Sequence, residues 1–280
     1  MKMENKRLVE FKERQRLKTI ENHDIEIKRN PHKSWWYLRT DNTAYMRSTH
    51  PFTMASDFFN AISPKTVLNL GDSRGGAESV YFKNIGWKSL PCDYITTVLK
   101  IAKEEIGFID DYAEQDMEDM TFNNDSFDYV ITKESLHHLS RPYSAIYEML
   151  RVAKEGICII EPRDYEYKFG DERYESCGNF CFGFSLKELV KTFTAMYYTE
   201  VCYRYICDIQ SIIDSCGNCG GEKFLQNKDK IQTKIDEWYS THTPEAGQLL
   251  MIFCFKHSPE HKEVLKKCGF TFLPVKKYNI

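Results

Sequence analysis

A glycine-rich turn follows an apolar segment in the first half of the chain. Residues 66–70 have the sequence TVLNL, which is typical of a short buried strand, and the turn GDSRGG begins at Gly71. Asp93 stands 22 residues after Gly71, at the end of a second apolar segment. Glycines let a backbone approach a ligand closely, and a carboxylate at the next strand end can accept hydrogen bonds from ribose hydroxyls. The spacing therefore favours a site for a nucleoside-containing ligand.

The turn alone does not identify that ligand, because nicotinamide and flavin enzymes use a similar arrangement. The sequence GDSRGG does not fit the G-x-G-x-x-G pattern of a turn that binds a pyrophosphate. A nucleotide-dependent oxidoreductase is therefore the weaker alternative at this point.

The segments from residue 66 onward alternate between strand and helix patterns, which indicates a parallel sheet with crossover helices. We predict an α/β fold: a doubly wound, mostly parallel, seven-stranded sheet that is Rossmann-like, with an antiparallel last strand. The strands are expected at 66–70, 88–93, 109–116, 127–136, 156–162, 199–206 and 249–255. Helices are expected from about residue 78 and over 96–107, 142–154 and 185–193.

The chain is expected to have two parts. Residues 1–62 form an N-terminal helical and aromatic cap, which contains a charged helix over residues 1–20. Residues 63–280 form the ligand-binding domain, with a polar insertion over residues 209–245 before the last strand.

The motifs behind the glycine turn resemble those of a known family. They are, in chain order, VLNLGDSRGG, CDY, QDMEDMTFNNDSFDYVITKESLHHL, EMLRVAKEG and ICIIEPRD. They are similar to the motifs of class I S-adenosylmethionine-dependent methyltransferases, especially the type 11 small-molecule group. The similarity covers about residues 65–165. Its second half is the more specific part, because the SFD pattern, the LHH segment and ExxRVxKxG seldom occur together elsewhere.

The resemblance implies an enzyme that binds S-adenosylmethionine and transfers its methyl group. It implies that Gly71 and Gly75 border the methionine part of the cofactor and that Asp93 binds the ribose. Asp116 and Met117 would flank the adenine. The complete set of predicted cofactor-binding residues is Asn69, Gly71, Ser73, Gly75, Asp93, Tyr94, Asp116, Met117 and Lys133.

Two residues depart from the usual pattern of the family. Asn69 stands where Asp or Glu is usual, and Ser73 stands where a second glycine is usual. Asn69 adds no negative charge near the cofactor's ammonium group, and Ser73 brings a Cβ atom to a tight backbone. The departures leave open a function of another class, a catalytically inactive cofactor-binding regulator or scaffold.

Methyl transfer is an in-line displacement at a sulfonium, so positioning the acceptor and excluding water supply much of the rate. A base is needed only where the acceptor is a hydroxyl. His137 and His138 follow the fourth strand, and a histidine suits this role because it titrates near neutral pH. We predict that one of them is a base or substrate contact; the alternative is one buried structural histidine and one solvated one.

The acceptor is expected to be a small molecule or a sugar, methylated at a hydroxyl, with an amino sugar or other small amine as the alternative. We expect its site between the cap, residues 165–185 and the insertion. Aromatic side chains near that position can stack on a sugar or ring. The predicted substrate contacts are Trp36, Tyr45, Arg163 and Asp164.

Two pairs of cysteines have spacings close to those of zinc ligands. Cys177 and Cys181 precede the helix expected over 185–193, and Cys216 and Cys219 lie in the insertion. If both loops leave the same edge of the sheet, the four thiols form a tetrahedral zinc site. The glycines of SCGNCGG fit an ordinary turn equally well.

Charge is distributed unevenly along the 280 residues, although the formal net charge is only -3. Residues 104–128 hold ten acidic side chains and no Lys or Arg, whereas residues 1–18 hold seven basic and three acidic ones. An acidic face repels phosphate backbones, so a nucleic-acid substrate is disfavoured. The sequence has no membrane span or secretory signal, and we expect a cytoplasmic protein.

Overall fold

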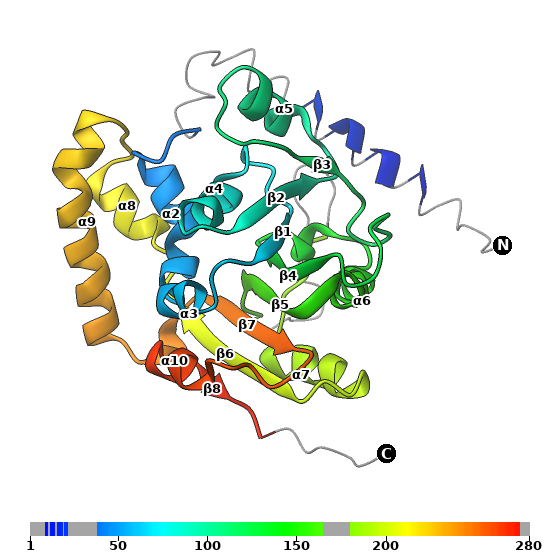
Figure 1. Cartoon of the computed structure of the whole chain (residues 1–280). Coiled ribbons are helices and arrows are strands. Elements are labelled where there is room, and N and C mark those ends of the chain that lie inside the picture. The colour runs from blue at the N-terminus through cyan, green and yellow to red at the C-terminus, as the bar shows by residue number, and fades with distance from the viewer. Residues whose placement is uncertain are drawn as a thin grey trace.

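The computed structural model describes residues 9–10, 12–14, 16–18, 20–21, 38–164 and 180–274. Its strands are β1 (Thr66–Leu70), β2 (Lys88–Asp93), β3 (Ala113–Glu114), β4 (Phe127–Lys133), β5 (Ala153–Pro162), β6 (Glu200–Ile206), β7 (Leu249–Phe255) and β8 (Thr271–Phe272). They form one sheet in the order β3-β2-β1-β4-β5-β7-β6-β8 (Figure 1).

The sheet is mostly parallel, as the sequence predicts. β1 to β5 pair in parallel, β7 runs antiparallel to β5 and to β6, and β8 runs antiparallel to β6. The predicted number of seven strands is wrong by one, because the short strand β8 follows β7. The predicted third strand is also too long, since β3 has only two residues and ends before Asp116.

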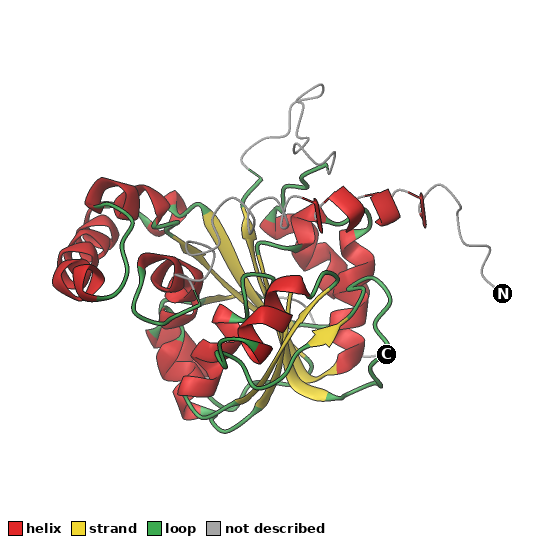
Figure 2. Cartoon of the chain, turned by 90° about the horizontal axis from the view of Figure 1, so that it is seen from above, coloured by secondary structure: helices red, strands yellow, loops and turns green. Residues whose placement is uncertain are grey.

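Helices cover both faces of the sheet (Figure 2). They are α2 (Thr43–Thr53), α3 (Ser56–Ala61), α4 (Ala77–Asn84), α5 (Thr97–Glu104), α6 (Pro142–Val152), α7 (Leu186–Ala195), α8 (Gln210–Cys216), α9 (Glu222–Thr241) and α10 (Lys262–Lys267), with 3-10 turns η1 (Leu136–His138) and η2 (Pro244–Ala246). None of the helices in the described ranges is both long and apolar enough to cross a membrane.

Local sequence explains where several helices begin. The Asn42 side chain accepts a hydrogen bond from the Tyr45 amide at the start of α2, and Ser185 accepts one from Glu188 at the start of α7. Pro142 occupies the first turn of α6, where its missing N–H costs nothing.

The helices α2 and α3 of the expected cap pack directly on the sheet. Phe58 and Phe59 are fully buried and lie edge-on or tilted against Phe253 of β7, with ring centroids 5.7 and 6.0 Å apart. Such aromatic pairs each add about 0.5–1.5 kcal/mol beyond their buried area. These contacts fix α3 on the sheet.

The insertion folds as α8 and α9, which lie beside α2 (Figure 1). Its core is a small cluster of buried side chains: Cys207, Ile209, Ile213, Ile231 and Ile235. The Thr43 amide donates to the carbonyl oxygen of Cys219 at 3.0 Å, and this hydrogen bond ties the α8–α9 turn to the start of α2. The division at residue 62 remains a prediction.

Candidate functional site

The glycine turn between β1 and α4 has the close packing that a ligand cradle needs. Gly71 has a φ of 76°, which L side chains rarely adopt, and a Cβ there would lie 2.0 Å from Ser135 Oγ. Gly75 has a φ of 80°, and a Cβ there would lie 2.0 Å from a methyl carbon of Leu38. Only glycine fits either position, so the residues present suit close approach of a cofactor.

Asp72 organises this turn, and the sequence did not single it out. Its buried carboxylate accepts hydrogen bonds from the amides of Ser79 at 3.0 Å and Glu78 at 3.4 Å. It therefore satisfies two amides at the start of α4 that have no partner within the helix.

Asn69 has a structural role in addition to its predicted place near the cofactor. Its Nδ2 donates to Ser79 Oγ at 2.9 Å and to Ser89 Oγ at 2.7 Å. The side chain thus links β1 to α4 and β2. Ser73 lies half-buried within the turn.

Asp93, at the end of β2, is held by the amide of Ile95, which donates to Oδ1 at 2.8 Å. Burial raises the pKa of Asp93 to about 7, although the backbone amides of Ile95 and Tyr94 oppose this shift. The carboxyl group therefore titrates near neutral pH in the ligand-free protein. Tyr94 follows it, and its ring centroid lies 5.7 Å from the Arg16 guanidinium.

Asp116 and Met117 lie just beyond β3, at the same edge of the sheet. The Glu118 amide donates to Asp116 Oδ1 at 2.9 Å, and Lys12 Nζ lies 2.5 Å from Oδ2. Met117 is buried. Both predicted adenine contacts are therefore near Asp93 and Tyr94 along this edge, since β3 pairs with β2 at Asp93.

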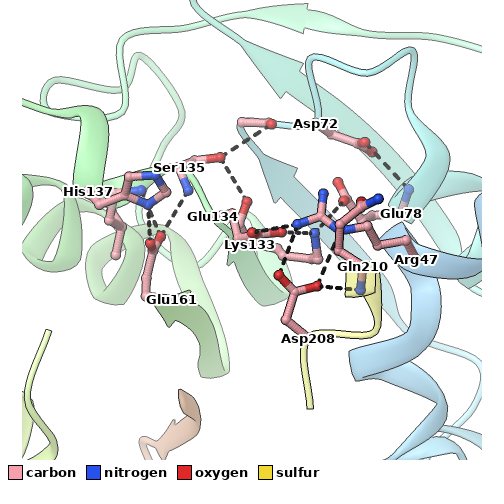
Figure 3. A network of polar contacts seen from close by, with 12 residues as sticks. Arg47, Asp72, Glu78, Lys133, Glu134, Ser135, His137, Glu161, Asp208 and Gln210 are labelled. Carbon is pink, nitrogen blue, oxygen red and sulfur yellow. Dashed lines mark hydrogen bonds and ion pairs between the residues drawn. The ribbon is translucent and has the colours of Figure 1, made fainter. Parts of the chain in front are cut away.

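A charged network lies at the carboxyl ends of β4 and β6 (Figure 3). Arg47 of α2 binds Asp208 through two contacts of 3.2 Å, and it lies 3.4 Å from Glu134. Glu134 also pairs with Lys133, whose ammonium lies 3.9 Å from Glu78. The network therefore connects the α2 helix, the end of β4 and the segment after β6.

The network sets the protonation of its acids. Burial opposes ionisation of Glu134, but Lys133 and Arg47 outweigh it and lower its pKa to about 2. Burial and the charge of Asp72 raise the pKa of Glu78 well above its usual value, although Lys133 opposes this. Glu134 is accordingly ionised at neutral pH, whereas burial shifts Glu78 toward its protonated form.

His137 and Glu161 form a second polar centre (Figure 3). His137 Nδ1 lies 2.6 Å from Oε2 of Glu161, which is fully buried at the end of β5. The other oxygen of Glu161 accepts from the amides of Ser135 at 2.9 Å and Leu136 at 2.8 Å. Because a carboxylate only accepts hydrogen bonds, His137 donates from Nδ1, and Nε2 is the basic nitrogen of the neutral ring. His138 packs against His137, with ring centroids 3.8 Å apart.

The predicted substrate contacts that lie in the described residues, Tyr45, Arg163 and Asp164, do not gather in one place. Arg163 donates to the carbonyl oxygens of Glu245 and of Gly247, the latter at 2.8 Å, and lies 3.8 Å above the ring of Tyr205. The amide of Asp164 donates to Phe184 O at 3.2 Å. These contacts hold the segments that follow β5 and precede β7.

Tyr45 lies on another side of α2, in an apolar cluster with Leu38 and Val80. Burial raises its pKa to about 12, so its hydroxyl stays protonated. Trp36 lies outside the described residues. The substrate roles of all four residues remain predictions.

The expected zinc site is not supported. Within the described part of the chain, no group of three or more His, Cys, Asp or Glu side chains is placed to hold a metal ion. Cys216 ends α8, and Cys219 lies in the turn between α8 and α9. Cys219 is buried, and its carbonyl oxygen accepts a hydrogen bond from the Thr43 amide. Cys181 lies between β5 and α7, and Cys177 lies outside the described residues. The C-x2-C spacing therefore corresponds to an ordinary turn between two helices.

Sequence reasoning missed four charged residues of the network: Arg47, Glu78 and the two acids that follow strands, Glu134 and Asp208. A signal existed for the two acids, because each follows a strand at its carboxyl end, and ligands bind at that end of the parallel strands in this fold. No local signal existed for Arg47, since its partner Asp208 is 161 residues away.

Residues 68–160 match a family model described as "Methyltransferase domain". A structure of an S-adenosylmethionine-dependent methyltransferase from Thermotoga maritima, described as a possible histamine N-methyltransferase, has a similar fold. It is 12% identical, with a TM-score of 0.50, and the match covers 83% of this chain and 97% of that one.

Phosphoethanolamine N-methyltransferase 2 of Haemonchus contortus, in complex with phosphomonomethylethanolamine and S-adenosylhomocysteine, is 15% identical with a TM-score of 0.50. That match covers 78% of this chain and 57% of the relative. At these identities the likeness shows the fold alone. No curated protein matches the chain.

The family match spans the glycine turn, the Asp93 and Asp116 strand ends and the His137 segment, and the strand order places all of them at one sheet edge. Residues 68–160 are therefore similar to a methyltransferase domain, and the chain has the fold of S-adenosylmethionine-dependent methyltransferase structures.

Proposed function

We propose that the chain methylates a hydroxyl group of a small-molecule or sugar acceptor, with His137 as the general base. The observation that carries the proposal is the contact of 2.6 Å between His137 Nδ1 and the buried carboxylate of Glu161. The pair lies beside the cofactor edge, because Ser135, two residues before His137, packs against Gly71. The cytoplasmic location remains a prediction from the sequence.

The residues at this edge fit S-adenosylmethionine, which supplies an electrophilic methyl group when bound. The turn at Gly71 leaves no room for a side chain, and Asp93 and Asp116 follow two neighbouring strands. Carboxylates at these positions can accept hydrogen bonds from ribose hydroxyls and from an adenine amino group.

The assignment of His137 as the general base follows from the roles of His137 and Glu161 in proton transfer. A hydroxyl becomes a strong nucleophile only when its proton is removed, and Nε2 of His137 can receive that proton. Glu161 accepts the Nδ1 hydrogen, which fixes the tautomer and stabilises the positive ring that results. A general base of this kind contributes about 10²–10⁴-fold to a rate. A neutral amine needs no such pair, so the pair favours a hydroxyl.

Methylation of an amine is the second candidate, and the acids of the charged network favour it. Glu134 stays ionised because Lys133 and Arg47 lower its pKa, and Asp208 also pairs with Arg47. Carboxylates attract an ammonium group. Two proteins of similar fold are also described as amine methyltransferases.

A screen of acceptors separates the two candidates. The protein is incubated with S-adenosylmethionine and a panel of sugars and nucleotide sugars, together with the matching amino sugars. We expect one added methyl group, detected by mass spectrometry, on sugars that carry no amine. If only amino sugars or other amines gain a methyl group, the hydroxyl proposal is wrong.

The same panel distinguishes an enzyme from a regulator. S-adenosylhomocysteine that binds in a calorimeter, with no methylated product across hydroxyl and amine acceptors, would support the inactive regulator. Binding together with product formation would exclude it.

A further inference from the structure

The basic and acidic runs of the sequence meet in the structure. The described residues between 9 and 21 are helical, and this N-terminal helical segment lies beside β3 (Figure 1). Its half-buried residues are Lys12, Arg16 and Ile20, four positions apart, so one face of the segment contacts the domain. Exposed residues on the other side include Glu13, Arg14, Leu17 and Lys18.

Lys12 is bound by two carboxylates that follow β3. Its Nζ lies 2.5 Å from Asp116 Oδ2 and 2.7 Å from Glu118 Oε2. The Glu118 side chain is fully buried and also binds Arg141 at 2.9 Å. Burial opposes the charged form of Lys12, but hydrogen bonds to Asp116 and Glu118 outweigh it and raise its pKa. Lys12 therefore stays charged.

Arg16, one helical turn later, contacts the residues beside Asp116. Its guanidinium lies 5.7 Å from the ring centroid of Tyr94 and 3.7 Å from Glu114. The segment thus lies across the ends of both β2 and β3. We expect the ribose and the adenine of the cofactor to bind at these strand ends.

We propose that the N-terminal helical segment is a latch that competes with the cofactor's adenine for the carboxylate of Asp116. The inference rests on the proposed cofactor site. Asp116 Oδ1 already accepts the Glu118 amide, and Oδ2 holds Lys12. An adenine amino group that binds this carboxylate in place of Lys12 has to displace the Lys12 ammonium. The cofactor therefore binds fully only to chains in which the latch has opened.

The latch lowers the apparent affinity for the cofactor by the fraction of chains that are open. The Lys12 and Asp116 side chains are 19% and 29% exposed, so solvent weakens this pair, whereas the fully buried Glu118 carboxylate holds Lys12 in the closed state. Removing the ammonium with Lys12→Met should tighten binding of S-adenosylhomocysteine by about 3- to 10-fold, the range expected for a partly populated open state.

Calorimetric titration with S-adenosylhomocysteine tests the latch on wild type, Lys12→Met and Arg14→Met. Arg14 is exposed on the same segment, so Arg14→Met removes an equal charge without touching the carboxylates and should leave the Kd unchanged. A Kd for Lys12→Met that equals or exceeds the wild-type value overturns the latch. If none of the three proteins binds S-adenosylhomocysteine, the proposed cofactor site is wrong, and so is the proposed competition.

Hydrogen exchange separates a latch from a lid that closes over the ligand. A latch predicts that amides of residues 9–21 exchange faster when S-adenosylhomocysteine is added, and faster in ligand-free Lys12→Met than in wild type. Slower exchange on addition of ligand means that the segment covers the bound cofactor, which contradicts competition.

Discussion

Nδ1 of His137 lies 2.6 Å from Oε2 of Glu161, although the two residues are 24 positions apart. The parallel pairing of β4 with β5 brings them together, since Lys133 lies opposite Ile160. The other oxygen of the same buried carboxylate holds the amides of Ser135 and Leu136. Glu161 therefore fixes both the turn after β4 and the orientation of the imidazole.

Replacing Glu161 by Gln should slow methyl transfer far more than it weakens cofactor binding. The amide oxygen can still accept from the backbone, but the amide nitrogen would face the donor Nδ1 and disfavour the active tautomer. We expect kcat to fall about 10²–10⁴-fold, the usual effect of losing a general base.

Glu155→Gln is the matched control, because Glu155 lies at the opposite end of β5, paired with Lys65. Its kcat should equal that of wild type. Equal kcat values for Glu161→Gln and Glu155→Gln would show that the imidazole does not depend on Glu161.

Cofactor binding should strengthen as the pH rises through about 7. Burial raises the pKa of Asp93 to about 7, and only the ionised carboxylate accepts two ribose hydrogen bonds. The Kd of S-adenosylhomocysteine, measured by calorimetry from about pH 5.5 to about pH 8, should therefore fall with pH in wild type. In Asp93→Asn binding should be weaker and its Kd nearly independent of pH, and a parallel slope in both proteins would exclude Asp93 as the titrating group.

The raised pKa of Asp93 also predicts how the free energy of unfolding depends on pH. The folded chain holds the Asp93 proton up to about pH 7, whereas the unfolded chain releases it near the ordinary pKa of 3.8. Stability is thus lost as the pH rises from about 4 to about 7. The free energy of unfolding of Asp93→Asn, relative to wild type, should increase over this interval in urea titrations. A constant difference would contradict the raised pKa.

Arg47 and Asp208 should be energetically coupled, because they join α2 to the segment after β6 through two contacts of 3.2 Å. Their side chains are 19% and 29% exposed, so we expect a coupling free energy of about 1 kcal/mol in a double-mutant cycle. Urea unfolding of Arg47→Met, Asp208→Asn and the double variant measures it. The exposed pair Lys83 and Asp110 is the control, with a coupling near zero; additivity at both pairs would refute the link.

Gly71→Ala tests the cradle at the glycine turn. A left-handed backbone costs an L residue about 1–2 kcal/mol, and the new Cβ would also lie 2.0 Å from Ser135 Oγ. Gly107 has a φ of 68°, and a Cβ there would meet no atom within 4 Å, so Gly107→Ala has the positive φ without the clash. Gly71→Ala should lower the Tm more and bind S-adenosylhomocysteine more than about 10-fold weaker, since a displaced turn no longer fits the ligand. Equal effects of the two substitutions would contradict a tight cradle.

The sheet was predictable from the sequence because its strands are apolar runs with clear boundaries. All seven residues of β7 are buried, and the turn before β4 is marked by polar residues. The short strand β8 escaped prediction because two residues carry no periodicity, and it forms only by pairing with β6. The charged helix α10 has a single buried residue, Leu265, and gave equally little signal.

The site was predictable where its residues stand at or just after the ends of strands, and unpredictable where it depends on contacts between other distant segments. Gly71, Asp93 and Asp116 stand at strand ends, and topology alone brings such positions to one edge. Lys12 and Asp116 are 104 residues apart, and no local pattern announces their contact. The C-x2-C spacing of Cys216 and Cys219 suggested a zinc site, but the same spacing also occurs in a short turn that joins two packed helices.

The proposed function depends above all on His137 removing a proton from the acceptor. The direct test is the single-turnover rate of His137→Gln with an acceptor from the screen, beside the exposed control His242→Gln. We predict a rate about 10²–10⁴-fold below wild type, with the Kd of S-adenosylhomocysteine changed less than about twofold. A His137→Gln rate equal to that of wild type and of His242→Gln would contradict this role of His137.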